Sequence, residues 1–289
     1  MENVSYVKFS ESINFLPDPH PLFKVGASIS PYAGCSMGCV YCPFGHEARV
    51  GVKTDFLYHL DRKLSGAVGQ LHLGLGPSCE PYGPHEKEFN ITRNSVEMIT
   101  SHDFPLQIFT KSPVVLRDMD IFREHSRKGL LAVSVSVMSR NKKLSEIFEP
   151  AVSPGGERIS VIKELSDNDI FSGAVLAPII PYISDSREQL EEVFESVKRA
   201  GGQYVLPSVF CADSPAAFGS LKEAVLRHFP NIFHRIDKIY ENSKLPAVTY
   251  TERINDLLEG LSLKYELPLY LPTEKDDSLP SGIRQELLR

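Results

Sequence analysis

Hydrophobic residues recur along the chain in two alternating patterns. Short apolar runs rich in β-branched residues predict buried strands. The predicted strands are 24–30, 70–76, 105–110, 131–137, 172–177 and 203–206. Between these runs, apolar residues spaced three or four positions apart predict amphipathic helices. The predicted helices are 55–65, 92–101, 118–127, 156–166, 187–200 and 216–229. Regular alternation of strand and helix predicts parallel strands joined by right-handed crossovers.

This alternation predicts an α/β fold. Six strand–helix units are too few to close an eight-stranded barrel, so we expect an open (β/α)6 partial TIM-type barrel over residues 24–212. Residues 1–23 are rich in proline, which favours an extended N-terminal arm. Residues 213–289 predict a C-terminal helical extension, and their polar, proline-containing end predicts a flexible tail.

Charge and hydropathy restrict the function further. The 289 residues carry a formal net charge of −6, which argues against a protein that coats nucleic acid by bulk charge, so no bulk duplex DNA binding is expected. A local basic groove is still possible. Apolar runs fall short of the roughly 20 residues that a membrane span needs, and the first residues lack the pattern of a signal peptide. We therefore expect a cytoplasmic protein without a membrane partner.

Three of the five cysteines lie within eight residues, in the segment SPYAGCSMGCVYCPFGH. Cytosolic thiols stay reduced, so this crowding indicates metal or redox chemistry rather than disulfides. Cys35, Cys39 and Cys42 follow the first predicted strand with the spacing C-x3-C-x2-C. A glycine-rich loop can wrap such thiolates around an iron–sulfur cluster. Three thiolates leave one iron without a protein ligand, whereas clusters that only transfer electrons normally have four cysteines.

A zinc site is the alternative interpretation of the same segment. His46 follows the third cysteine after three residues, so a Cys3His site would be possible. The chain would then be a non-catalytic zinc- or cluster-binding module. Structural zinc sites usually belong to small modules that lack a core, whereas this loop lies in a large α/β domain, so the cluster is favoured.

The cysteine spacing, with Tyr41 just before the third cysteine, resembles the signature of the radical S-adenosylmethionine superfamily. The resemblance extends over about residues 24–210 and is strongest to the spore photoproduct lyase-like branch. The matching stretches are SPYAGCSMGCVYC, PSCEPYGPHE, FPLQIFTKSPVVLRDMD, VSVSV, FEPAVSPGGERI and GAVLAPIIP. Each lies near the carboxyl end of a predicted strand or just before the next helix, where α/β barrels build their active face.

The resemblance implies two cofactors, a [4Fe–4S] cluster on the three cysteines and S-adenosyl-L-methionine on the open iron. It also implies an external one-electron reductant of flavodoxin or ferredoxin type. The electron would cleave S-adenosylmethionine to a 5′-deoxyadenosyl radical, which would take hydrogen from a substrate that the sequence does not identify. A nucleic-acid lesion is one possible substrate. A peptide, a nucleotide or a small metabolite is the alternative.

Candidate cofactor-binding residues follow from the same resemblance. Tyr41 would lie beside the cofactor. Ser78 and Glu80 occupy the turn where many relatives carry Gly-Gly-Glu to hold the cofactor's amino group, although that triplet is absent here. Lys111, at the end of the third strand, would reach the cofactor's carboxylate. An ordinary surface lysine is the alternative.

The fourth strand and two cysteines supply further candidates. Ser134 and Ser136 alternate with valines on the fourth strand, which predicts a polar lumen suited to a zwitterion. A half-solvated strand is the alternative for Ser134. Cys79 resembles the cysteine that returns a hydrogen atom to the product radical in spore photoproduct lyase, and Cys211 has a similar position after the sixth strand. Either cysteine could instead be a small buried hydrophobe. Glu149 and Arg158 are expected to form a structural ion pair.

Overall fold

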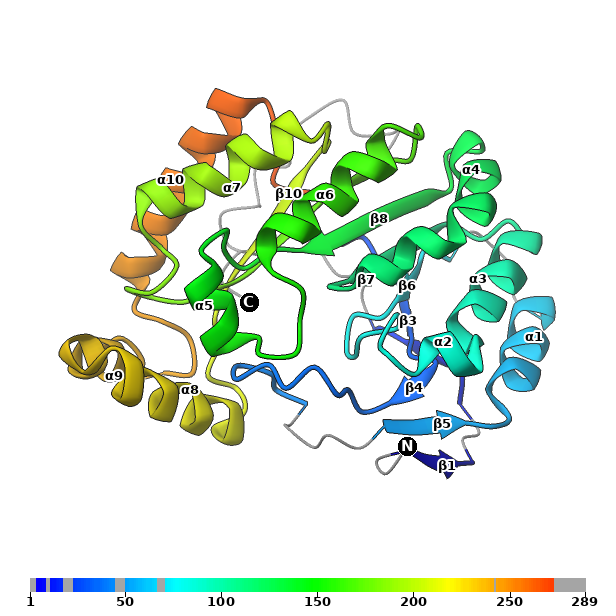
Figure 1. The fold of residues 1–289 in the computed structure, drawn as a ribbon, viewed down its shortest axis with the longest axis horizontal. Coiled ribbons are helices and arrows are strands. Elements are labelled where there is room, and N and C mark those ends of the chain that lie inside the picture. The colour runs from blue at the N-terminus through cyan, green and yellow to red at the C-terminus, as the bar shows by residue number, and fades with distance from the viewer. Residues whose placement is uncertain are drawn as a thin grey trace.

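A seven-stranded sheet forms the centre of the molecule (Figure 1). The computed structural model describes residues 4–8, 11–17, 23–44, 50–66, 71–241 and 243–272. The strand order is β10-β9-β8-β7-β6-β3-β2, and all neighbouring pairs from β10 to β3 are parallel. The strands are β2 (Ile13–Phe15), β3 (Ala27–Ile29), β6 (Leu73–Leu75), β7 (Leu106–Thr110), β8 (Leu131–Ser136), β9 (Ser172–Ile179) and β10 (Val205–Val209). The predicted α/β class with parallel strands is therefore confirmed.

Helices connect the parallel strands, and in Figure 1 they follow one another around one side of the sheet. The longer helices are α1 (Phe56–Gly66), α3 (Ile91–Ser101), α4 (Met119–Arg127), α6 (Gly155–Ser166), α7 (Arg187–Arg199), α8 (Pro215–His228) and α10 (Val248–Tyr265). The short ones are α2 (Glu86–Phe89), α5 (Lys142–Phe148), α9 (Phe233–Ile239) and the 3-10 turns Pro113–Asp118 and Pro230–Ile232. Among the described residues, no helix is long and apolar enough to cross a bilayer.

The described parts of the N-terminal segment contribute strands to two sheets. Strand β2 lies antiparallel to β3 at the edge of the main sheet. Strand β1 (Val4–Val7) pairs in parallel with β5 (Val50–Lys53), which pairs with β4 (Tyr32–Ala33) in a second, three-stranded sheet. The cysteine segment follows β4 and precedes β5 along the chain, so both of its flanks are anchored in this second sheet.

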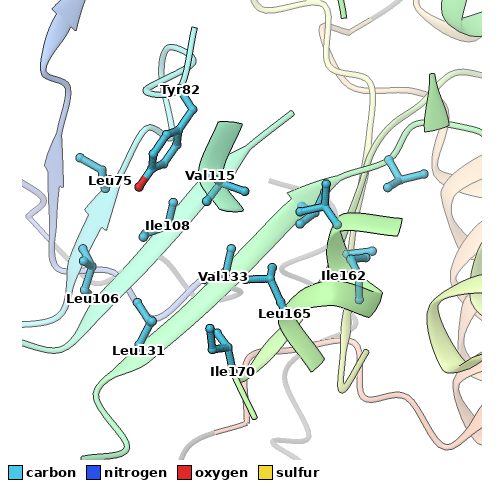
Figure 2. Packing of buried hydrophobic residues seen from close by; sticks show 14 of the residues in the cluster. Leu75, Tyr82, Leu106, Ile108, Val115, Leu131, Val133, Ile162, Leu165 and Ile170 are labelled. Carbon is cyan, nitrogen blue, oxygen red and sulfur yellow. The ribbon is translucent and has the colours of Figure 1, made fainter. Parts of the chain in front are cut away.

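The main core lies between the sheet and these helices. Figure 2 shows Leu131 and Val133 of β8 directed toward the side of the sheet that carries Ile162 and Leu165 of α6. These side chains are almost fully buried. Burying an aliphatic side chain contributes roughly 1.5–3 kcal/mol. This core fixes the strand ends in place, and the candidate chemistry lies at those ends.

Candidate active site

A cavity of about 430 Å³ lies at the carboxyl ends of the parallel strands. This volume falls within the roughly 300–1,000 Å³ that small-molecule sites occupy. Every side chain proposed from the sequence for the cluster, the cofactor or the hydrogen transfer lines it. The predicted residues in its wall are Cys35, Cys39, Tyr41, Cys42, Ser78, Cys79, Glu80, Lys111, Ser134 and Ser136. The structure thus brings these residues together, and their individual roles stay predictions.

The cysteine segment is a tightly wound loop. Gly34 and Gly38 have φ values of 81° and 63°, in the left-handed region that favours glycine. The backbone N–H of Val40 donates to the carbonyl oxygen of Phe148 over 2.9 Å, which ties the loop to the end of α5. Burial raises the pKa of the Cys39 thiol to about 12. A bound metal would reverse this effect, because a coordinating thiol is deprotonated.

The three thiols suit a cluster because they come from one glycine-rich loop and line one cavity. Cys39 is buried, and Cys35 and Cys42 are partly exposed. Within the described part of the chain, no three His, Cys, Asp or Glu side chains are placed to hold a metal ion. In an iron–sulfur cluster each thiolate binds a different iron, so the three thiols need not converge on one point as they would around a single metal ion. His46, the fourth ligand of the zinc alternative, lies outside the described residues.

Glu80 joins the turn after β6 to the end of β7. Its carboxylate accepts hydrogen bonds from the Tyr82 N–H at 3.0 Å, the Thr110 hydroxyl at 2.5 Å and the Lys111 N–H at 2.6 Å. Burial raises its pKa despite these donors. A carboxylate has about four acceptor sites. Glu80 can therefore accept one further hydrogen bond from a ligand in the cavity.

The ammonium group of Lys111 lies inside the cavity wall. Its Nζ donates to Ser136 Oγ over 2.7 Å and lies 3.6 Å from the Glu149 carboxylate. The same atom lies 5.7 Å from the centre of the Tyr41 ring. The side chain is only 20% exposed, so Lys111 is not an ordinary surface lysine.

Glu149 and Arg158 form the ion pair expected from the sequence, and both side chains are fully buried. Glu149 also accepts a hydrogen bond from the Tyr41 hydroxyl, and Arg158 donates to the carbonyl oxygen of Ser136 over 2.6 Å. Burial opposes ionisation, but the charges of Arg158 and Lys111 hold the pKa of Glu149 below its usual value. This network connects the cysteine loop to Lys111 through one carboxylate.

The serines of β8 point inward, as predicted. Ser134 is fully buried, so the half-solvated alternative is wrong. Its hydroxyl accepts a hydrogen bond from Gln107 Nε2 at 2.8 Å and lies 2.8 Å from the Tyr204 hydroxyl. The alternating Val133 and Val135 belong to the hydrophobic core. The lumen side of β8 is therefore polar and its helix side is apolar.

Two further cysteines line the cavity. The Cys79 thiol donates to the Tyr32 carbonyl oxygen over 3.4 Å, and burial raises its pKa to about 11. The Cys211 thiol donates to the Asp213 carboxylate over 3.0 Å. Asp213 was not predicted from the sequence. It lies in the short segment between the end of β10 and the start of α8, and this position near a strand end was the available signal.

No protein-family model matches the chain. An uncharacterized protein of Mycobacterium tuberculosis is 22% identical over 255 residues, covering 83% of this chain and 74% of that protein. An uncharacterized protein of Methanocaldococcus jannaschii is 30% identical over 166 residues, covering 54% of this chain and 61% of that protein.

Solved structures match over more of the chain. A spore photoproduct lyase variant with bound AdoMet and dinucleoside spore photoproduct has a TM-score of 0.68 and 16% identity, covering 93% of this chain and 82% of that one. SuiB of Streptococcus suis, bound to the precursor peptide SuiA, has a TM-score of 0.60 and 12% identity, covering 87% of this chain and 48% of that one. The chain has the fold of these radical S-adenosylmethionine enzymes. This likeness agrees with the expected α/β fold with parallel strands, and the number of strand–helix units stays a prediction.

Proposed function

We propose that this protein is a radical S-adenosylmethionine enzyme of the spore photoproduct lyase-like branch, built on a (β/α)6 partial barrel. Cys35, Cys39 and Cys42 would hold a [4Fe–4S] cluster. When bound and reduced, the cluster would supply one electron for the reductive cleavage of S-adenosylmethionine. The observation that carries the proposal is one cavity that combines three loop thiols with a fixed carboxylate and a fixed ammonium group. It lies in the fold that binds AdoMet in the spore photoproduct lyase variant.

The polar residues of the cavity suit the zwitterionic end of S-adenosylmethionine. Glu80 and Lys111 belong to adjacent strand ends and carry opposite charges. Glu80 would accept a hydrogen bond from the cofactor's ammonium group, and Lys111 would donate to its carboxylate. Lys111 and Arg158 share the single charge of Glu149. Their combined charge therefore remains positive and favours an anionic group beside Lys111.

The remaining side chains would position these groups. Ser136 orients the Lys111 ammonium group through their hydrogen bond. Tyr41 contributes its ring face to the same ammonium group, a favourable cation–π contact. Ser134 is held by Gln107 and Tyr204 and would shape the cavity floor. Ser78 lies in the wall beside Glu80 and would contact the amino end of the cofactor.

Anaerobic reconstitution tests the proposal. The protein is loaded with iron and sulfide, mixed with S-adenosylmethionine and dithionite, and assayed for 5′-deoxyadenosine by chromatography and mass spectrometry. We expect 5′-deoxyadenosine only when protein, cofactor and reductant are all present. A protein that retains one tightly bound zinc and takes up no iron would instead be the non-catalytic module.

Substitution of Lys111 by alanine should weaken S-adenosylmethionine binding by about ten- to a hundredfold, because a hydrogen bond to a charged group contributes roughly 1.5–3 kcal/mol. Isothermal titration calorimetry of the reconstituted protein measures this change. Lys142→Ala is the matched control, since its side chain is 75% exposed on α5. An unchanged affinity in Lys111→Ala would remove Lys111 from the cofactor site.

Two substrate classes have support from the structural relatives. Spore photoproduct lyase has been solved with a dinucleoside spore photoproduct, which favours a nucleic-acid lesion. SuiB has been solved with a precursor peptide, which favours peptide modification. We place the lesion first because that relative covers more of both chains. The reductant would be a cytoplasmic flavodoxin- or ferredoxin-type protein.

Undamaged duplex DNA should bind weakly or not at all. A protein that contacts many phosphates loses affinity steeply as salt rises, and the net charge of −6 opposes such contacts. A lesion could still bind, because a damaged base costs less to extrude than a normal one. A gel shift with random duplex at two salt concentrations measures this. Tight, salt-sensitive binding would contradict the expectation.

A further inference from the structure

Three helices cover one side of the cysteine loop. Helices α5, α8 and α9 contribute side chains to the same buried apolar cluster as the loop, and in Figure 1 the chain after β4 runs toward α5 and α8. Phe148 of α5 is fully buried, and its carbonyl oxygen accepts the N–H of Val40, the residue after Cys39. The Phe148 ring stacks on Phe229, just after α8, with ring centres 6.2 Å apart. Two packed aromatic rings therefore connect the loop to the surface at the end of α8.

The solvent side of these three helices is positively charged. Their sequences contain six lysine and arginine residues but three aspartate and glutamate residues, whereas the whole chain has a net charge of −6. Two of the acidic side chains are paired within the same helices, since Glu146 lies 3.8 Å from Lys142 and Asp237 lies 2.6 Å from Lys222. The other four basic side chains are exposed and form no ion pair with any described residue. These four side chains define the basic surface: Lys143, Arg227, Arg235 and Lys238.

The basic surface also has an apolar part. Leu226 is 54% exposed beside Arg227, and Phe229 is partly exposed three residues later. An apolar centre with a polar rim is the usual anatomy of a protein–protein interface. Among the described residues that line the cavity, none belongs to α5, α8 or α9. This position behind the loop favours a partner that acts on the cluster over a substrate that enters the cavity.

We propose that the basic surface is where an acidic one-electron carrier protein docks to reduce the cluster, an inference that rests on the proposed function. One electron passes from the reduced carrier to the cluster, so the carrier is oxidised and the cluster is reduced by the same single electron. Opposite charges on two proteins speed their encounter and orient them. Electron-transfer encounters bury less than about 1,200 Å² in total, so a surface formed by three helices is large enough.

A charge-reversed double variant, Lys143→Glu/Arg227→Glu, tests the docking site with two reductants. The reconstituted protein is reduced either by dithionite, a small molecule, or by a bacterial flavodoxin, an acidic carrier that NADPH and its reductase keep reduced. With dithionite the variant should form 5′-deoxyadenosine as fast as the wild-type protein, which also shows that it is folded and loaded. With flavodoxin at low salt we expect its rate to fall by about tenfold or more, because attraction becomes repulsion. Added salt should slow the wild-type reaction with flavodoxin but leave the reaction with dithionite unchanged.

Lys63→Glu/Arg199→Glu is the matched control, because it makes the same charge change at exposed positions of α1 and α7, away from the apolar cluster around the loop. It should keep the wild-type rate with both reductants. Lys143→Gln/Arg227→Gln, which removes the charges without reversing them, should show a smaller loss with flavodoxin than the charge-reversed variant.

Three results would overturn the docking site. They are an unchanged flavodoxin rate in Lys143→Glu/Arg227→Glu, an equal loss in the control, and a flavodoxin rate that does not respond to salt. If the charge-reversed variant keeps its flavodoxin rate but loses binding to single-stranded DNA in a gel shift, the basic surface belongs to nucleic acid instead. A wild-type protein that binds iron but forms no 5′-deoxyadenosine with dithionite would refute the proposed function itself.

Discussion

Replacement of Cys35, Cys39 or Cys42 by alanine should remove most of the bound iron and abolish 5′-deoxyadenosine formation. The reconstituted wild-type protein is expected to bind about four irons per chain, as a [4Fe–4S] cluster requires. Three thiolates bind three of the four irons, so one iron stays open for the cofactor. Loss of one thiolate exposes a second iron to solvent, so the cluster should not persist. Iron analysis, visible absorbance and the 5′-deoxyadenosine assay measure the three consequences separately.

Cys79→Ala provides the matched comparison for these variants. Cys79 lines the same cavity but lies outside the loop. The variant should bind iron like the wild-type protein if the three loop thiols suffice. Loss of iron in Cys79→Ala would make Cys79 a fourth ligand, and the mechanism through an open iron would have to be abandoned. Full iron content in all three loop variants would contradict the cluster assignment.

The parallel strands could be predicted from the sequence because each is a continuous apolar run between polar segments. The run 131–137 became β8, with its serines and valines on opposite faces. The second sheet could not be predicted. Strand β4 has only two residues, and β5 is paired by an N-terminal strand that lies over 40 residues earlier in the chain. Pairing over this distance leaves no local periodicity. Helix α5 was not predicted from the sequence, because its seven residues are too few to show a clear helical periodicity.

The candidate site could be located from the sequence because its residues fall at strand ends, and parallel strands bring those ends to one edge of the sheet. The hydrogen-bond partners could not be deduced. Glu80 was predicted as a ligand for an amino group, yet most of its acceptor sites are occupied by neighbouring donors. The bond between Tyr41 and Glu149 joins residues 108 positions apart. Such partners depend on how the strands and the loop pack in three dimensions.

The buried ion pair of Glu149 and Arg158 gives the second large expected effect. Arg158→Met should lower the free energy of unfolding by about 3–5 kcal/mol, because removal of one partner leaves an uncompensated buried charge. Glu149 would keep the Tyr41 hydroxyl as a donor and Lys111 at 3.6 Å, but it would lose its strongest partner. Urea denaturation of the protein, followed by circular dichroism, measures the change.

A control and a second substitution separate charge from packing. Lys163→Met lies on the same helix α6 and removes an exposed pair with Asp167, so it should leave the denaturation curve unchanged. Adding Glu149→Leu to Arg158→Met should recover part of the lost stability, because an apolar pair leaves no unpaired charge. A loss below about 1 kcal/mol in Arg158→Met, within the range of an exposed pair, would mean that water or Lys111 compensates Glu149. If the double variant is stable but no longer binds S-adenosylmethionine, Glu149 acts by placing Lys111 and Tyr41 around the cofactor.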